Sequence, residues 1–285
     1  MTTITPGELP LREFHQILLS GVGPRPIALV STMDAQGNVN LSPFSFFNVF
    51  GSNPPVAAIG PGHSGRTGKP KDTFLNLMET GECTISMVTY SMTEQVNLAS
   101  CEYEKGTDEF LKSNLTKRES ELVKPPSVAE SPFVLECKLM QHIPLFHDEG
   151  GNGNMILLRI LKLHIADEVY TDGKIDPRKL DLVARMGYNW YSRAHGDALF
   201  EVIKPTWNGI GMDNLPRFLK SSEILSAADL AKLAGVKEIP QRDDNFLKAN
   251  ELTDSDLQSF EQTAKKFLKE NKVQEAWQIL LSGGL

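Results

Sequence analysis

The sequence has few cysteines, and its basic residues form no run that would indicate a basic surface. Its 285 residues include three cysteines, Cys83, Cys101 and Cys137, and none has Cys-x-x-Cys spacing. A sparse, odd number is typical of reduced thiols in a cytosol-like compartment. We expect buried or half-buried, unreactive thiols, because free cysteine is usually buried. The net charge is −7, and no basic run is interleaved with aromatic residues, which argues against nucleic acid as a partner.

Long apolar runs are missing as well. No stretch approaches the roughly 18–20 apolar residues that a membrane-spanning helix needs. The chain also does not open on a basic segment followed by an apolar one, the pattern of a secretory signal. We therefore expect a cytoplasmic protein that does not partner with a membrane.

The sequence contains matches to metal-site and nucleotide-site patterns, but the residues around them do not support either kind of site. The only metal-like cluster comprises His142, His147, Asp148 and Glu149, and we favour solvated loop residues over a metal site there. Residues 60–65 match the Gly-x-Gly-x-x-Gly dinucleotide fingerprint letter by letter. No helix opens at the third glycine and no βαβ repeat surrounds it, so we do not assign a Rossmann site.

Short β-type runs dominate the first two thirds of the chain. They cover residues 27–32, 39–52, 56–59, 83–88, 133–140 and 155–165. We read 39–52 as one strand ended by the turn Asn53-Pro54-Pro55, and 155–165 as a bent strand. A helix is predicted over residues 72–80, with Asp72 as its N-cap and Gly81 as its stop. Short strands with antiparallel turns and only short helices predict a mainly β fold with some α structure, a closed β-barrel with short peripheral helices.

The composition changes after Phe200. Residues 205–285 contain no convincing strand, whereas Ser226 and Asp229 form a capping-box pattern before a helix that Gly235 ends. We therefore divide the chain into a barrel domain at residues 1–204 and a C-terminal helical extension at residues 205–285. Ordinary amphipathic helices favour a structural packing role for the extension.

Residues 39–75 combine hydroxyls, aromatics and cations around a turn. This mixture suits a ligand with a flat aromatic part and a phosphate tail. Arg25 stands between two prolines, which hold its backbone extended; a solvated or salt-bridged arginine and a functional one are equally favoured. For Arg185, a surface cation and a contact to a phosphate or a ring are likewise both open.

These residues resemble the flavin reductase-like family of FMN-binding split barrels. The similarity extends from about residue 21 to residue 203, and its order and spacing are specific although no single piece is diagnostic. The matching pieces are residues 23–32, 40–48, 53–55, 71–73, 97–100, 129–132 and 185–187. The resemblance implies FMN as cofactor, a homodimer, NADH or NADPH as electron donor, and a partner monooxygenase or other redox protein.

The resemblance also implies which residues hold FMN. The isoalloxazine ring and ribityl chain would lie along Ser42, Pro43, Phe44, Ser45 and Phe46, with a further contact from Asn48. The phosphate would bind in the loop of residues 64–73, through Arg66, Lys71 and Thr73 and the helix that starts at Asp72. Arg185 would close the site. Flavin itself transfers hydride and electrons, so no catalytic acid–base pair is required.

Three functions remain open at this point. The first is an NAD(P)H-dependent flavin reductase, and the second is a non-enzymatic FMN electron carrier of the flavoredoxin type that serves a protein partner. A weaker third is a split barrel that binds another planar cofactor, such as haem or deazaflavin. The first two would use the same pocket, so the sequence does not separate them.

Overall fold

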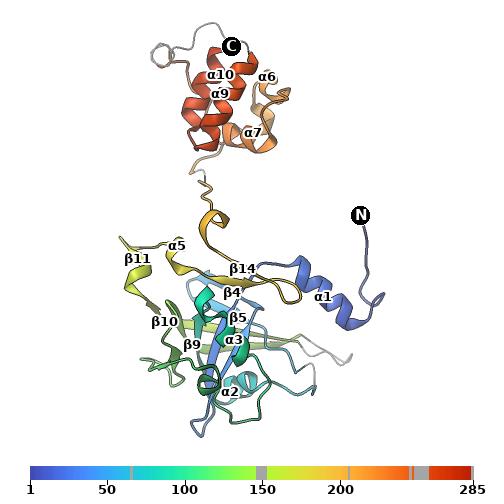
Figure 1. Ribbon diagram of the computed structural model, residues 1–285, viewed down its shortest axis with the longest axis vertical. Helices are drawn as coiled ribbons and strands as arrows, with labels where there is room; N and C mark the ends of the chain where they lie inside the picture. Colours follow the sequence, from blue (N-terminus) through green and yellow to red (C-terminus); the bar gives the residue numbers. More distant parts are fainter. Residues whose placement is uncertain (65–66, 146–152, 205, 244–245, 247–256, 284–285) are drawn as a thin grey trace. The chain divides into compact units, whose positions relative to one another are not determined.

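A computed structural model describes residues 1–64, 67–145, 153–204, 206–243, 246 and 257–283. The chain divides into two compact units, Met1–Phe200 and Glu201–Leu285, shown in Figure 1. Each unit has its own hydrophobic core, so each is described by itself.

Unit 1 is built on a seven-stranded antiparallel sheet with the strand order β3-β2-β6-β9-β10-β5-β4. The longest pair, β9 with β10, shifts register at two places. Such irregularities are typical of bent strands, the form predicted for β10. The seven strands are β2 (Ala28–Met33), β3 (Val39–Phe44), β4 (Phe47–Ser52), β5 (Pro55–Ile59), β6 (Glu82–Met87), β9 (Phe133–Pro144) and β10 (Asn154–Ile165).

Strands β3 and β4 are consecutive in sequence but stand at opposite ends of the strand order. The prediction of one strand over residues 39–52 was therefore wrong: β3 pairs with β2, and β4 pairs with β5. Only Ser45 and Phe46 separate them. Because an extended residue spans at most about 3.6 Å, this crossover brings the two edges together, and the sheet curls into the expected split barrel.

Smaller elements surround this barrel (Figure 1). Three short sheets contain β1 (Arg25–Pro26), β13 (Val183–Arg185) and β14 (Tyr191–Arg193); β7 (Lys117–Arg118) and β8 (Ser127–Val128); and β11 (Tyr170–Thr171) and β12 (Lys174–Ile175). The helices are α1 (Leu11–Gly21), α2 (Asp72–Thr80), α3 (Thr93–Ala99), α4 (Glu109–Ser113) and α5 (Pro177–Leu180), with 3-10 turns at Tyr90–Met92, Asp167–Val169 and Gly196–Ala198.

Two apolar clusters hold unit 1 together. One combines side chains of β2, β5, β6, β9 and β10 with Leu77 of α2, and the other joins β2 and β3 to α3 and α4. Cys83 and Cys137 are register partners on β6 and β9 and are fully buried, as expected. Cys101 is exposed, so the expectation of burial was wrong for this residue, which lies just after the end of α3.

Helix α2 begins one residue earlier than the capping prediction implied. Its N-cap is Lys71, in extended conformation, and Asp72 is the first helical residue. Asp72 was therefore wrongly expected to cap the helix, although its carboxylate still lies in the first turn, where the helix dipole favours negative charge. Gly81 ends the helix as predicted, with a φ of 70° that glycine adopts without a steric cost.

In the described part of unit 2, every regular element is helical. Its core surrounds the fully buried Trp277, whose indole N–H donates to the Leu233 carbonyl over 3.1 Å. Ser226 and Asp229 form the predicted capping box at the start of α7. The elements are α6 (Arg217–Lys220), α7 (Ala227–Ala234), α9 (Leu257–Lys269), α10 (Val273–Ser282) and a 3-10 turn at Met212–Asn214.

Candidate functional site

Strand β3 and the start of α2 meet, although about thirty residues separate them in sequence. The Asn40 side-chain amide donates to the Thr73 hydroxyl over 2.8 Å. The Lys71 ammonium lies 5.7 Å from the centre of the Phe44 ring, a cation–π distance. The two segments that the sequence assigns to the ring and to the phosphate are therefore held side by side.

Within the first turn of α2, the three expected ligands differ in accessibility. Lys71 and Asp72 are half-buried. Thr73 is fully buried, and its hydroxyl already accepts the bond from Asn40. Because the first N–H groups of an α-helix have no intrahelical acceptor, Asp72 and Thr73 can offer backbone donors to a phosphate without moving their side chains.

The loop between β5 and α2 is anchored at its start by a buried polar contact. The Asn154 amide donates to the Pro61 carbonyl over 3.0 Å, and its oxygen lies 2.8 Å from His142 Nε2. His142 belongs to β9 and also contacts the Phe74 ring, with centroids 5.1 Å apart. The prediction that His142 is a solvated loop residue was therefore wrong.

Further along, the loop closes on itself. The backbone N–H of Ser64 donates to the Lys69 carbonyl over 2.8 Å, and Gly68 donates back to Ser64 over 2.9 Å. The Ser64 hydroxyl donates to Glu102 over 2.7 Å, which ties the loop to the segment after α3. Arg66, which the sequence assigns to the phosphate, lies outside the described residues.

At the crossover, Ser45 is half-buried and Phe46 is half-exposed. The Phe46 carbonyl accepts from Gly60 N–H over 2.8 Å, and a Cβ on Gly60 would stand 2.8 Å from the Phe46 Cβ. Only glycine therefore fits there. Ser42 and Pro43 are half-buried in β3 and Phe44 is buried, so Ser42 to Phe46 form one continuous strip that leads to the phosphate loop.

Arg25 lies behind the crossover. Its guanidinium is buried and reaches the Ser45 hydroxyl at 3.5 Å. It also donates to the carbonyls at the end of α1, those of Leu19 and Val22, and therefore holds α1 against the barrel. Arg25 is buried, and no carboxylate among the described residues pairs with it. Within the described part of the chain, the expectation of a solvated or salt-bridged arginine was therefore wrong.

Asn48 lines an apolar cavity of about 250 Å³ next to the crossover. Its side-chain oxygen accepts from Val49 N–H over 2.8 Å. A largely apolar hollow with one or two polar groups at its margin is the usual form of a small-molecule site. The other lining residues are Pro26, Phe47, Val49, Met87, Phe133, Leu135, Ile175, Leu180 and Leu182.

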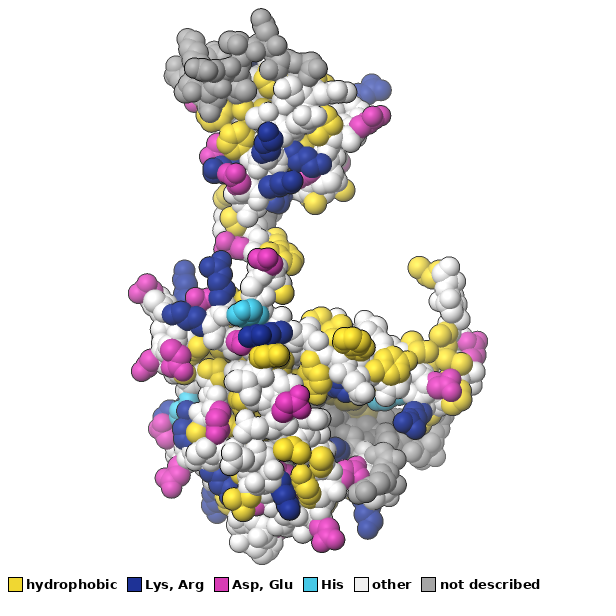
Figure 2. Space-filling view, viewed as in Figure 1, with side chains coloured by type: hydrophobic (Ala, Val, Ile, Leu, Met, Phe, Trp, Pro, Cys, Tyr) yellow, Lys and Arg dark blue, Asp and Glu magenta, His cyan; other side chains and the backbone are white. Residues whose placement is uncertain are grey.

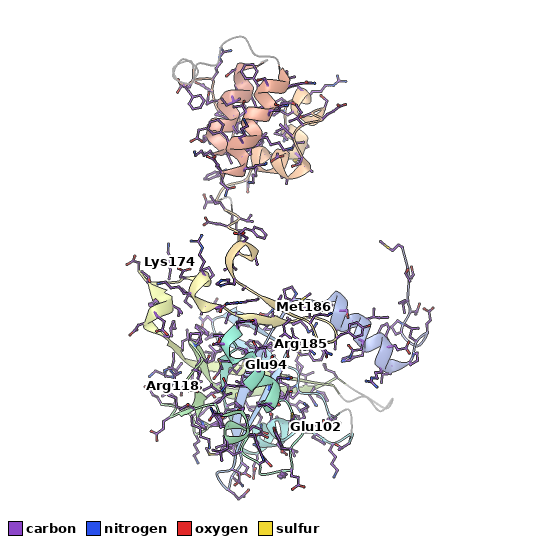
Figure 3. The ribbon with its side chains drawn as sticks, in the orientation of Figure 1. Glu94, Glu102, Arg118, Lys174, Arg185 and Met186 are labelled. Atoms are coloured by element: carbon purple, nitrogen blue, oxygen red, sulfur yellow. The ribbon has the colours of Figure 1, made fainter. Side chains whose placement is uncertain are left out.

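Arg185 projects from β13, at the start of the turn to β14 (Figure 3). Its guanidinium donates to the Trp190 carbonyl over 3.0 Å and lies 4.6 Å from the centre of the Tyr191 ring. The following Gly187 packs against α1, where a Cβ would meet the Ser20 hydroxyl oxygen at 2.1 Å. This close approach explains the glycine in the motif of residues 185–187.

A buried carboxylate supports the other side of β3. Glu109 of α4 accepts from Leu41 N–H over 2.9 Å, one residue before Ser42. Burial raises the pKa of Glu109 above its ordinary value, and the hydrogen bond from Leu41 opposes this effect. Sequence reasoning missed Glu109, because nothing in a short polar helix indicates that its first residue will face a strand.

Within the described ranges, no group of three histidine, cysteine or acidic side chains is placed to hold a metal ion. His147, Asp148 and Glu149 of the metal-like cluster lie outside those ranges. Among the helices that the structure describes, none is both long and apolar enough to cross a membrane.

The fold defines a split-barrel protein, and comparison with known proteins gives its family. The model of the flavin reductase like domain matches residues 21–180. The chain belongs to this flavin-related oxidoreductase family. An uncharacterised protein of Halalkalibacterium halodurans is 36% identical over 208 residues, which cover 71% of this chain and 96% of the relative.

Solved structures agree with this assignment. Component B of nitrilotriacetate monooxygenase from Bacillus cereus is 27% identical, with a TM-score of 0.66 over 72% of this chain and 98% of that one. A candidate flavin reductase with a split barrel domain from Shewanella frigidimarina is 31% identical, with a TM-score of 0.59 over 69% and 94%. Flavoredoxin of Desulfovibrio vulgaris, 21% identical with a TM-score of 0.55 over 72% and 97%, shares the fold.

Proposed function

We propose that this protein binds FMN at the crossover and uses NADH or NADPH to reduce flavin. The observation that carries the proposal is the junction of β3 with α2, where Lys71 lies over Phe44 and Thr73 is bonded to Asn40. It places a strip of backbone and hydroxyl donors next to a helix N-terminus with a cation. A flat ring with a phosphate tail needs these two surfaces at one site.

The residues present fit FMN chemically. Backbone groups and hydroxyls from Ser42 to Ser45 can hydrogen-bond the polar edge of the ring, and the half-exposed Phe46 offers an apolar face. Lys71, Arg66 and the first N–H groups of α2 supply the positive charge and donors that a dianionic phosphate requires. When bound, FMN supplies the hydride and electron chemistry, and this chain orients the ring and excludes water.

We further propose that the protein is a homodimer. Phe46, Val49 and Phe50 are about half-exposed, at 50%, 54% and 53% of their surface. Val49 and Phe50 belong to β4, at one end of the strand order, and Phe46 lies just before it. Exposed apolar side chains grouped at such an edge are typical of a surface that another chain covers. Component B of nitrilotriacetate monooxygenase, a similar structure, supports a monooxygenase as the acceptor of reduced flavin.

Two measurements, made one after the other, test the proposal. The purified protein should be yellow and release FMN on denaturation; absorbance of haem or deazaflavin instead would refute FMN. Steady-state oxidation of NADH and of NADPH with added FMN then tests the enzyme. Bound FMN without turnover by either nucleotide, together with rapid reduction by a ferredoxin-type donor, would instead establish an electron carrier.

A further inference from the structure

Arg25 and Arg185 are direct register partners across the antiparallel pair of β1 and β13. Like charges directly opposite each other in a sheet are destabilising. Burial lowers the pKa of Arg25, and the positive charge of Arg185 lowers it further, so the two guanidinium groups interact. Among the described residues, no carboxylate pairs with either of them. The oxygens to which Arg25 donates in the described part of the chain, those of Leu19, Val22, Ser45 and Met186, are uncharged.

Arg193 shows the usual arrangement in the same hairpin. On β14, its guanidinium forms a bidentate pair with Asp181, at 2.7 Å and 2.8 Å. It also stacks on the Tyr90 ring, 3.8 Å from the ring centre. Within one small sheet, therefore, one arginine has a carboxylate partner, and the two that face each other have none.

The two facing arginines differ in what they can contact. Arg25 is 7% exposed and its donors already form hydrogen bonds within the protein. It therefore contributes positive charge to the site without contacting a ligand directly. Arg185 is half-buried and makes one hydrogen bond, to the Trp190 carbonyl. A guanidinium has five N–H donors in a fork that matches carboxylate and phosphate oxygens. Arg185 can therefore bind an oxyanion directly.

Aromatic side chains stand next to this charge. Tyr188 and Trp190, in the turn after Arg185, are 62% and 73% exposed. Tyr188 has a φ of 52°, a conformation that is uncommon for a bulky residue and is often found at functional sites. The face seen in Figure 2 carries hydrophobic side chains along this hairpin and α1, and Figure 3 places Arg185 and Met186 there.

We propose that the Arg25–Arg185 pair binds the carboxylate or phosphate group of a second, planar aromatic ligand, the electron donor or acceptor that meets the flavin. This inference rests on the proposed function, because the ligand is a second one only if FMN is the first. The single phosphate of FMN is assigned to the loop of residues 64–73 and α2, which belong to other elements. An oxyanion here would offset the like-charge repulsion, and Tyr188 and Trp190 would stack on the ring.

Two anions probe the site and distinguish the ligand's source. Benzoate represents an aromatic acid, and inorganic pyrophosphate represents a dinucleotide. Each is titrated at low chloride, with and without saturating FMN, while the melting temperature is followed, because a ligand that binds only the folded state raises it. We expect at least one anion to bind FMN-saturated protein. A larger effect of benzoate indicates an aromatic acid, and a larger effect of pyrophosphate indicates a dinucleotide.

Substitutions distinguish an effect of the Arg185 charge on anion binding from a general loss of stability. Arg185→Gln should weaken the apparent affinity about tenfold, the effect of one charge-assisted hydrogen bond. Arg185→Lys should restore part of it. The matched control, Arg193→Gln, breaks the pair with Asp181 and lowers the melting temperature, but should leave the anion-induced shift intact.

The proposal is overturned if neither anion stabilises the wild-type protein, or if Arg185→Gln responds as the wild type does. Titration without FMN keeps this outcome distinct from failure of the proposed function. A protein that takes up no FMN but still binds anions through Arg185 would refute the flavin assignment alone.

Discussion

The Asn154 oxygen lies 2.8 Å from His142 Nε2, on neighbouring strands of the barrel, while the Asn154 amide holds the Pro61 carbonyl. One side chain thus joins the sheet to the start of the β5–α2 loop, which contains the proposed phosphate-binding residues. Asn154 is 3% exposed, so its removal leaves buried polar groups without a partner.

Replacing Asn154 with leucine should lower the free energy of unfolding by about 1–3 kcal/mol, the cost of an unsatisfied buried group. FMN affinity should fall as well, since the loop loses its anchor. Urea unfolding and FMN titration measure the two effects. Asn208→Leu, at an exposed position of unit 2, is the control; equal FMN affinity in both variants would show that the anchor does not position the loop.

Lys71→Ala should weaken FMN binding by about 1–3 kcal/mol, the range of a hydrogen bond to a charged group. Arg66→Ala should have an effect of the same size. Fluorescence titration with FMN gives the affinities. Lys174→Ala, on β12 and exposed (Figure 3), removes the same charge elsewhere. If Lys71→Ala and Arg66→Ala both bind FMN as tightly as Lys174→Ala, the phosphate lies in another place.

Glu109→Gln should stabilise the protein at neutral pH. Burial raises the pKa of Glu109, so the folded protein holds this proton more tightly than the unfolded chain. The ionised carboxylate therefore costs stability above the raised pKa, and the cost is relieved as the pH falls through that value towards the unfolded one. The glutamine oxygen can still accept from Leu41.

The test is the unfolding free energy of Glu109→Gln and wild type in urea between pH 8 and pH 4. We expect the advantage of the variant to shrink on acidification. Glu94→Gln, at an exposed residue of α3 (Figure 3), should show no such trend. A pH-independent difference for Glu109→Gln would mean that packing, not charge, decides its effect.

Trp277→Ala should unfold unit 2 selectively. The indole is fully buried and bonded to Leu233, and truncation of a buried tryptophan costs about 3–5 kcal/mol. Hydrogen exchange read by mass spectrometry should show lost protection in residues 201–285 and retained protection in residues 1–200. Trp207→Ala, at a half-exposed residue of the same unit, is the matched control. Loss of protection in both units would show that they do not fold separately.

Much of the barrel could be predicted because its signals are local. Alternating or continuous apolar runs marked β2, β6, β9 and β10, and the glycine at residue 81 marked the end of α2. The split of residues 39–52 could not be predicted. Both halves are equally β-like, and the break exists only because β3 pairs with β2 while β4 pairs with β5.

The site residues likewise divide into those that local sequence signals indicate and those that only the tertiary structure reveals. The resemblance to the flavin reductase-like family indicated Lys71, Thr73 and Ser45, through the type and order of residues in the matching pieces. Their actual surroundings depend on partners distant in sequence: Asn40 for Thr73, and Arg25 for Ser45. Glu109 and Asn154 belong to no motif, and the cluster that contained His142 led to the wrong environment for it, so only the folded chain reveals the roles of these three residues.

The sequence alone determined the residue chemistry of the strip and loop at residues 39–75, the mainly β character of the first two thirds, and the helical character of the rest. These follow from periodicity and composition, which act over a few neighbouring residues. Only the tertiary structure decided that Arg25 faces Arg185, because register between distant strands depends on how the whole sheet closes.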